Sequence, residues 1–321
     1  MSHRAFLKSF FTEHWKYMTV NAACKLNLFD GLDEIGKTKY QIANLLSVPE
    51  KNIELLLNGL VSINFLDEVE RHFKLNERSI LLTEKHPDSL KYACLNWSGD
   101  HLEAWKNLDV SIKTGKSAFE NNYRMGYFDY LNQDEEKLDH YHKAMFAYAK
   151  DDYCNITDVI NFNIHKSVMD VGGGYGAAIS NIKKVLPDVE CFLFDLDEVI
   201  TKCHLDNNVK PIKGDFFIEI PQLAEAMMLS RVLHDWNDEK VNQILNNAYQ
   251  TLPENGSLYI IENCSDKIDV DLSLLSLNML CMCESYERSS YEYIALANQS
   301  KFRFIEAKKL NELQTILIFK K

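Results

Sequence analysis

The sequence lacks the features that would place the protein in a membrane or on nucleic acid. It contains no run of about 18 apolar residues, so no transmembrane helix is predicted. The first residues, Met1–Phe6, have neither a long apolar stretch nor a small-residue cleavage site, so no signal peptide is predicted. Basic charge is scarce, since the net charge is −12, and nucleic-acid binding needs a basic surface. We therefore expect a cytoplasmic protein that binds neither membrane nor nucleic acid.

The sequence also lacks the cysteine spacing of a metal site or a disulfide framework. Its eight cysteines are scattered, and Cys281 and Cys283 form a Cys-x-Cys pair without a nearby group of histidines. Zinc sites commonly use Cys-x-x-Cys pairs, and disulfide frameworks belong to small secreted domains. We expect free thiols in a reducing compartment and no metal.

What the sequence does contain is enough material for more than one domain. Its 321 residues are 46% hydrophobic and 26% charged, which is typical of a globular protein. Residues 1–100 predict a small helical domain, and residues 101–165 predict aromatic-rich helices that could line a pocket for a flat apolar ligand. In residues 166–321 strands and helices alternate, which predicts a Rossmann-like, doubly wound α/β sheet. The strands are expected at 168–171, 191–194, 226–230, 257–261 and 313–319.

The N-terminal domain has the pattern of a winged helix. Helices are expected at 18–28, at 38–46 and after Pro49, followed by a hairpin over 65–75. Winged helices can bind DNA, but between Gln41 and Lys74 the acidic residues outnumber the basic ones. The apolar residues of 6–28 exceed what a small domain can cover, which indicates an interface. We expect a homodimer to form through this domain.

A glycine-rich turn is the most informative motif. Residues 168–171 predict a buried strand that runs into Gly172–Gly176 and then into a helix over 177–185. Glycine lets the backbone turn sharply and approach a ligand closely. The next strand ends in Asp195, about 20 residues further on, where an acid suits the two hydroxyls of a ribose.

This geometry suits either a dinucleotide or S-adenosylmethionine. A dinucleotide site uses G-x-G-x-x-G and aims a helix N-terminus at a pyrophosphate. Here the glycines follow Asp170 in the pattern Asp-x-Gly-x-Gly-x-Gly. An acid before the turn favours a cationic ligand, so we expect S-adenosylmethionine, with S-adenosylhomocysteine as its demethylated product.

Several further motifs resemble one family along nearly the whole chain, in the family's order. The matching segments are 26–30, 128–131, 170–174, 194–196, 214–217, 229–236 and 277–280. The chain resembles the class I, S-adenosylmethionine-dependent small-molecule O-methyltransferases of plants and bacteria, like those acting on hydroxyindoles and caffeate. Their N-terminal winged helix serves dimerisation.

The resemblance implies roles for individual residues. His234 matches the family's general base, and an imidazole is largely unprotonated at neutral pH. Glu262 and Glu287 match two carboxylates that hold this imidazole. The residues expected around the cofactor are Asp170, Gly172, Gly174, Asp195, Leu196, Asp215, Phe216, Ser230 and Arg231. The residues expected around the acceptor, a small hydroxylated aromatic metabolite, are Trp105, Tyr127, Phe128, Met145, Asn278, Met279 and Tyr286.

Two segments depart from the family pattern. Ser285 and Tyr286 stand where the family usually has a glycine pair, which predicts a reshaped acceptor pocket. Lys301 stands where a glycine usually ends a helix, so it must adopt a left-handed conformation or the helix must end differently. Two other functions remain open at this point: a methyltransferase-like enzyme with different chemistry, and an acidic winged-helix regulator that senses S-adenosylmethionine.

Overall fold

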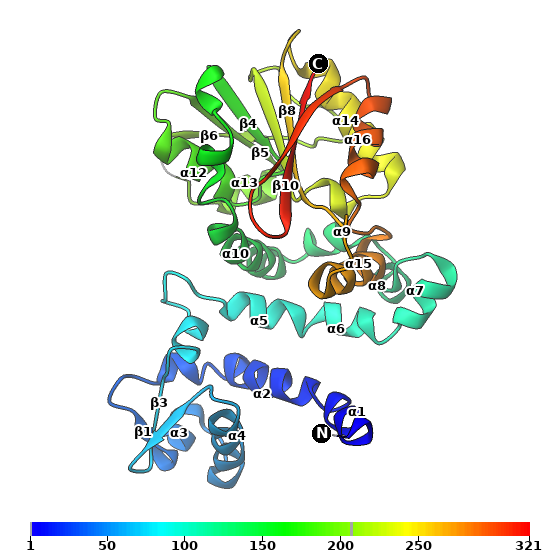
Figure 1. The fold of residues 1–321 in the computed structure, drawn as a ribbon. Coiled ribbons are helices and arrows are strands. Elements are labelled where there is room, and N and C mark those ends of the chain that lie inside the picture. Colours follow the sequence, from blue (N-terminus) through cyan, green and yellow to red (C-terminus); the bar gives the residue numbers. More distant parts are fainter. Residues whose placement is uncertain (1, 206–207) are drawn as a thin grey trace. The chain divides into compact units, whose positions relative to one another are not determined.

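The computed structural model describes residues 2–205 and 208–321, which form two compact units divided between Asp100 and His101. Figure 1 labels their elements. Among these residues, no helix is both long enough and apolar enough to cross a bilayer.

The first unit packs helices against a small antiparallel sheet. Its helices are α1 (His3–Phe10), α2 (His14–Lys25), α3 (Lys39–Leu46), α4 (Glu50–Ser62) and α5 (Lys91–Trp97), with short 3-10 turns at Phe29–Gly31 and Ser79–Leu82. The strands β1 (Lys37–Thr38), β2 (Asp67–Val69) and β3 (His72–Lys74) pair in the order β1-β3-β2. Glu70 and Arg71 join β2 to β3 with positive φ angles of 51° and 63°, as a tight hairpin requires. The predicted winged helix is therefore confirmed.

The local sequence accounts for this unit's helix boundaries and core. Thr38 caps α3 in a reciprocal pair with Gln41, and Pro49 precedes α4. Ile53, Leu57 and Leu60 recur on one face of α4 and are almost fully buried. Helix α1, in contrast, has no buried residue.

The second unit contains a seven-stranded sheet in the order β6-β5-β4-β7-β8-β10-β9. In chain order the strands are β4 (Ser167–Val171), β5 (Glu190–Asp195), β6 (Val209–Lys213), β7 (Ala226–Ser230), β8 (Ser257–Asn263), β9 (Arg303–Lys309) and β10 (Gln314–Lys320). Strands β4 to β8 pair in parallel, whereas β10 runs antiparallel to both β8 and β9. The predicted doubly wound sheet is confirmed.

Helices cover both faces of this sheet, so its strands are apolar on both sides. Helices α12 (Ala177–Val185) and α13 (Asp197–Lys202) lie over one face, and α14 (Asp238–Thr251) and α16 (Ser290–Gln299) over the other (Figure 1). Successive strand residues alternate between two separate cores: Met227 packs with one and Met228 with the other. This alternation follows from the two-residue period of a strand.

The remaining helices are α6 (Asp100–Trp105), α7 (Leu108–Thr114), α8 (Ala118–Tyr123), α9 (Tyr127–Leu131), α10 (Glu135–Asp152), α11 (Ile156–Val159) and α15 (Val270–Cys283), with 3-10 turns at Phe162–Ile164 and Leu233–Asp235 (η4). Of these, α9, α10 and α15 lie near the carboxyl ends of the parallel strands (Figure 1). Helix α15 packs against α7, α8 and η4. Residues 101–165 thus belong to the same compact unit as the sheet.

Candidate active site

The site begins where the order of the sheet reverses. Strand β4 lies between β5 and β7, and ligands of such sheets bind at the carboxyl ends of the strands beside this point. Gly172, Gly174 and Gly176 have φ angles of 72°, 58° and 77°, a region that other residues adopt only with strain. A Cβ on Gly173 would lie 2.6 Å from the Asp170 carboxyl group. The turn therefore requires glycine for two reasons, conformation and space.

Two carboxyl groups, those of Asp170 and Asp195, lie next to this glycine turn. Asp195 ends β5, and its two oxygens accept hydrogen bonds from the amides of Gly174 and Leu196, each 2.7 Å long. Burial raises the pKa of Asp195 to about 6. Burial, helped by the charge of Asp195, raises the pKa of Asp170 to about 7. Among the described residues, Oδ1 of Asp170 is buried without a hydrogen-bond partner. The arrangement favours a ligand that brings positive charge and hydroxyl donors.

The structure brings most of the other predicted cofactor residues to the same place. The ring of Phe216 lies 3.2 Å from the position of a Cβ on Gly172. Asp215 accepts a hydrogen bond of 2.8 Å from the amide of Phe217, so it shapes the loop. Ser230, at the end of β7, shares a 2.7 Å hydrogen bond with the hydroxyl of Tyr153. Leu196 precedes the first turn of α13.

Arg231 is an exception, because it is directed into an ion-pair cluster rather than toward the glycine turn. Its guanidinium donates to Oε2 of Glu262 at 3.2 Å and to the two oxygens of Glu287 at 2.9 and 3.0 Å. The contact between Arg231 and the cofactor stays a prediction, whereas the structure shows an internal role for its guanidinium. Two buried carboxylates need a cation close by, and Arg231 provides it.

Glu262 also differs from its predicted role. It is the penultimate residue of β8 and is completely buried, but among the described residues its hydrogen bonds go to Arg231 and to backbone amides rather than to the imidazole of His234. Its Oε1 accepts hydrogen bonds from the amides of Val232, Leu233 and His234 at 3.1, 2.9 and 3.3 Å. Glu262 thus fixes the backbone of η4, which carries His234, instead of bracing the ring.

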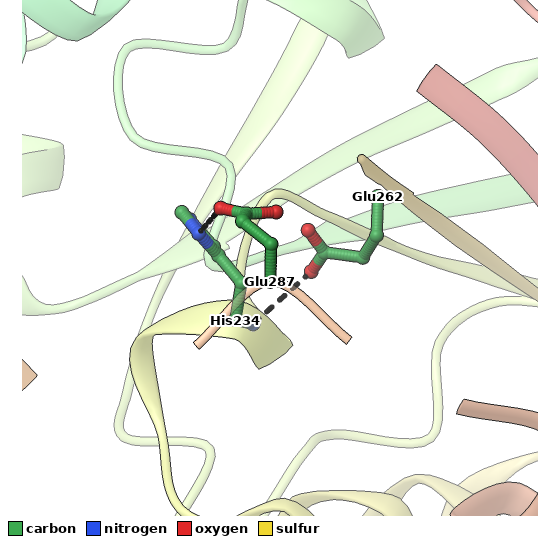
Figure 2. A group of neighbouring side chains, drawn as sticks. All are labelled: His234, Glu262 and Glu287. Carbon is green, nitrogen blue, oxygen red and sulfur yellow. Dashed lines mark hydrogen bonds and ion pairs between the residues drawn. The ribbon is translucent and has the colours of Figure 1, made fainter. Parts of the chain in front are cut away.

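Glu287 does contact the ring, as predicted. Figure 2 shows its carboxylate against the imidazole, with Nδ1 of His234 lying 2.8 Å from Oε1. Burial alone would raise the pKa of Glu287, but the charges of Arg231 and His234 outweigh it and hold the pKa below its usual range. An ionised carboxylate can only accept, so the hydrogen of a neutral His234 resides on Nδ1. Nε2 is then left with a lone pair.

Nearby carboxylates make His234 easier to protonate. Burial and Arg231 lower the pKa of His234, but Asp235, Glu287 and Glu262 together outweigh them and raise it above the ordinary value. Oδ1 of Asp235 lies 3.4 Å from Nε2. The imidazole therefore lies between Glu287 on its Nδ1 side and Asp235 on its Nε2 side, where a proton gained at Nε2 is stabilised.

The cluster of His234, Glu262 and Glu287 also has the ligand types of a metal site, with donor atoms within 4.8 Å of one another. Arg231, however, donates to both carboxylates. Its guanidinium thus supplies the positive charge that an ion would bring, and we interpret the group as an ion-pair network.

Aromatic residues connect the cofactor side to the predicted acceptor pocket. The ring of Trp236 lies 5.4 Å from that of Phe128 and 6.2 Å from that of Phe216. Tyr127 and Tyr141 extend the group beyond Phe128. Met145 follows Tyr141 by one helical turn on α10, so the two share a face.

Other predicted pocket residues have different partners. The indole of Trp105 donates to Oδ1 of Asn278 at 2.8 Å, and Met279 is buried beside it in α15. Tyr286 was predicted to line the pocket, but it is 41% exposed and donates to Glu292 at 2.9 Å. Because the neighbouring Ser285 and Glu287 are buried, the alternating chain directs Tyr286 outward.

The sequence did not indicate a second arginine, Arg288, that holds the turn carrying His234. Arg288 is only 1% exposed and donates to the carbonyl oxygens of Leu233 at 3.1 Å and Trp236 at 2.8 Å. It also pairs with Asp238 at 2.7 Å. The resemblance implied a role for the neighbouring Glu287 but none for Arg288. Tyr153, the partner of Ser230, belongs to the aromatic-rich segment 101–165, but the sequence did not indicate this contact.

Comparison with known proteins agrees with this geometry. Residues 105–303 match the O-methyltransferase domain, and residues 9–85 match the O-methyltransferase dimerisation domain. The chain is 27% identical over 301 residues to the phenazine O-methyltransferase PhzM of Lysobacter antibioticus, a match that covers 91% of this chain and 88% of that protein.

Solved structures show the same fold over the whole chain. The crystal structure of LaPhzM aligns with a TM-score of 0.95 at 25% identity, covering 100% of this chain and 99% of that one. Human N-acetylserotonin methyltransferase, solved in complex with SAM, aligns with a TM-score of 0.90 at 23% identity, covering 100% and 98%. Because the O-methyltransferase domain spans more than half of the sequence and the dimerisation domain precedes it, the protein belongs to the O-methyltransferase family.

Proposed function

We propose that the protein transfers a methyl group from S-adenosylmethionine to a hydroxyl of a small aromatic acceptor, with His234 as the general base. The observation that carries this proposal is the 2.8 Å contact between Nδ1 of His234 and the ionised Glu287. This contact leaves Nε2 able to accept a proton at the carboxyl end of the sheet.

The residues around the glycine turn suit the proposed cofactor. S-adenosylmethionine, when bound, supplies a methyl group on a positively charged sulfur. Asp195 would accept from the ribose hydroxyls. Oδ1 of Asp170, which has no hydrogen-bond partner in the part of the chain that the structure describes, lies next to a turn whose glycines permit close approach. Phe216 would contact the adenine from its place against Gly172. The complex of the human relative with SAM supports the assignment.

The proposed acceptor is a small aromatic compound with a phenolic hydroxyl. A phenol with a pKa near 10 is protonated at neutral pH, so a positioned base accelerates its reaction. His234 would take the phenolic proton at Nε2, while Glu287 holds the ring and stabilises the imidazolium that forms. The rings of Phe128 and Trp236, with centroids 5.4 Å apart, would contact a flat acceptor. The relative that acts on a phenazine is consistent with such a ligand.

We further propose that the protein works as a homodimer. The dimerisation-domain match covers residues 9–85. Phe6, Phe10, Phe11 and Trp15 are all more than half exposed on or beside α1. A second copy of the chain would cover these side chains.

The test replaces His234. His234→Gln should lower kcat by about 10²- to 10⁴-fold, the usual contribution of a positioned base, while calorimetry shows unchanged binding of S-adenosylhomocysteine. The exposed His204→Gln is the matched control. Acceptors are found by screening phenols with isotope-labelled S-adenosylmethionine and mass spectrometry.

The same assay gives a pH dependence with a defined sign. Because the neighbouring carboxylates raise the pKa of His234, activity should fall as the pH drops through a value above the ordinary 6.5 of histidine. Glu287→Gln should weaken turnover less than His234→Gln does, and the two effects should not add. Near-normal turnover by His234→Gln on the true acceptor would show that the base assignment is wrong.

A further inference from the structure

Arg231 contacts the whole group formed by His234, Glu262 and Glu287, which a cofactor ligand would not need to do. Besides its bonds to Glu262 and Glu287, its Nη2 lies 3.1 Å from Nδ1 of His234. The side chains of Glu262 and Glu287 are completely buried, and that of Arg231 is 20% exposed. The guanidinium therefore touches both carboxylates and the imidazole at once.

The backbone at Arg231 is unusual in a way that places this side chain. Arg231 has a φ of 56°, a left-handed conformation that is strained for any residue with a Cβ. Its amide donates to the carbonyl of Ile261 at 2.9 Å, which ties the bend to the end of β8. Such strain persists only where the surroundings fix it, and it concentrates at functional sites. Here the bend brings Arg231 and His234 to the same carboxylate, Glu287.

We propose that Arg231 is a positioning residue for the general base: it orients Glu287 so that the carboxylate keeps the hydrogen of His234 on Nδ1. The guanidinium of Arg231 can only donate hydrogen bonds. If Nδ1 of His234 carried no hydrogen, Arg231 would donate to its lone pair; if Nδ1 carries the hydrogen, Nδ1 donates to Glu287. Arg231 donates to both oxygens of Glu287, at 2.9 and 3.0 Å, and so holds this carboxylate ionised and oriented. This contact favours the arrangement with the hydrogen of His234 on Nδ1. This inference rests on the proposed role of His234.

The charges around His234 predict how the loss of Arg231 would act. His234 faces Arg231 and Asp235 from its own turn, Glu262 from β8, and Glu287 from the segment after α15. Tyr141 of α10 and Cys283 at the end of α15 face Asp235. Arg231 is the cation of the group, and its charge lowers the pKa of His234 against the three carboxylates. Without it, His234 should hold its proton to higher pH.

The experiment compares three variants by two readouts. Arg231→Asn removes the charge while tolerating the left-handed backbone, since asparagine adopts it readily. Arg231→Lys keeps the charge but loses the two-point contact. Arg231→Asn combined with Glu262→Gln removes one charge of each sign. The exposed Arg303→Asn is the control. The readouts are the pH profile of kcat and an NMR titration of the His234 ring in the cofactor-free protein.

The proposal predicts a distinct pattern. Arg231→Asn should move the acid limb and the NMR titration of His234 upward by about one pH unit, the size expected for losing a close charge. Its plateau kcat should also fall. Arg231→Lys should lower the plateau kcat and leave the pH of the acid limb unchanged. The double variant should return the limb toward that of the parent, and Arg303→Asn should change neither.

Other results would overturn the proposal. A merely structural role would lower kcat at every pH without moving either titration. If Arg231→Asn fails to fold, the double variant compared with Glu262→Gln alone decides the same question, because the two differ only at Arg231. If His234→Gln keeps its turnover, the proposed base is wrong, yet the NMR titration still decides whether Arg231 controls the His234 ring. An unchanged titration in folded Arg231 variants would refute the inference.

Discussion

Asp195 offers the sharpest test of the cofactor site, because only its ionised carboxylate can accept hydrogen bonds from both ribose hydroxyls. Its carboxylate already accepts from the amides of Gly174 and Leu196, and burial raises its pKa to about 6. Ribose hydroxyls would donate to the ionised form, so binding should lower this pKa. Affinity should therefore be full above pH 6 and decline as the pH falls through that value.

The magnitude follows from linkage. With a pKa of about 6, lowering the pH from about 7.5 to about 5.5 reduces the ionised fraction from about 0.97 to about 0.24, so affinity should fall about fourfold. A steeper fall would report Asp170 as well, since its pKa is about 7. S-adenosylhomocysteine is the appropriate ligand, because it carries the ribose without the sulfonium charge.

Isothermal titration calorimetry at the two pH values measures this change directly. Asp195→Asn should weaken binding by about 1–3 kcal/mol, the penalty for unpaired polar groups, and should abolish the fourfold pH response. Asp197→Asn is the matched control, because Asp197 is exposed and pairs with Lys213 nearby. A pH response that persists unchanged in Asp195→Asn would refute the reasoning.

Two further predictions concern the glycine turn and the assembly. Gly173→Ala should lower the melting temperature more than Gly174→Ala, because a Cβ at 173 would meet Asp170 and Leu193 at 2.6 Å, whereas at 174 the nearest atom is 3.4 Å away and the strain of φ 58° is about 1–2 kcal/mol; equal losses in thermal unfolding would count against the packing argument. Phe6→Ser combined with Phe10→Ser should convert a homodimer to monomer in light scattering, since these stacked rings are exposed on α1; an undiminished dimer would place the interface elsewhere.

The sequence predicted those parts of the fold that depend on local patterns. The five predicted strands are present. Of the two alternatives for Lys301, the structure shows the left-handed conformation, with a φ of 71°. Strands β6 and β9 were missed because they carry edge patterns: β6 contains Pro211 with exposed lysines, and β9 is mostly exposed. Edge strands lack the continuous apolar run by which buried strands are recognised.

The candidate site was predictable to the level of which residues meet, but not of how they meet. His234, Glu262 and Glu287 come from three segments, and the motifs brought all three into one site. Glu262 accepts from the three amides that follow the left-handed bend at Arg231, and such a bend leaves no periodic trace in the sequence. The direction of the Tyr286 side chain was not predictable for a similar reason, because it depends on the burial of its neighbours.

The three amides held by Glu262 make the assembly of the site observable without any ligand. One carboxylate oxygen at the end of β8 accepts from three consecutive backbone groups after β7. Those amides can resist hydrogen exchange only while the two strands are docked, so their exchange rates report the local opening free energy of this junction. A substitution could therefore be sorted by whether it loosens the junction or alters the chemistry above an intact one. Such a measurement would separate damage to the scaffold from loss of catalysis in variants that are equally inactive.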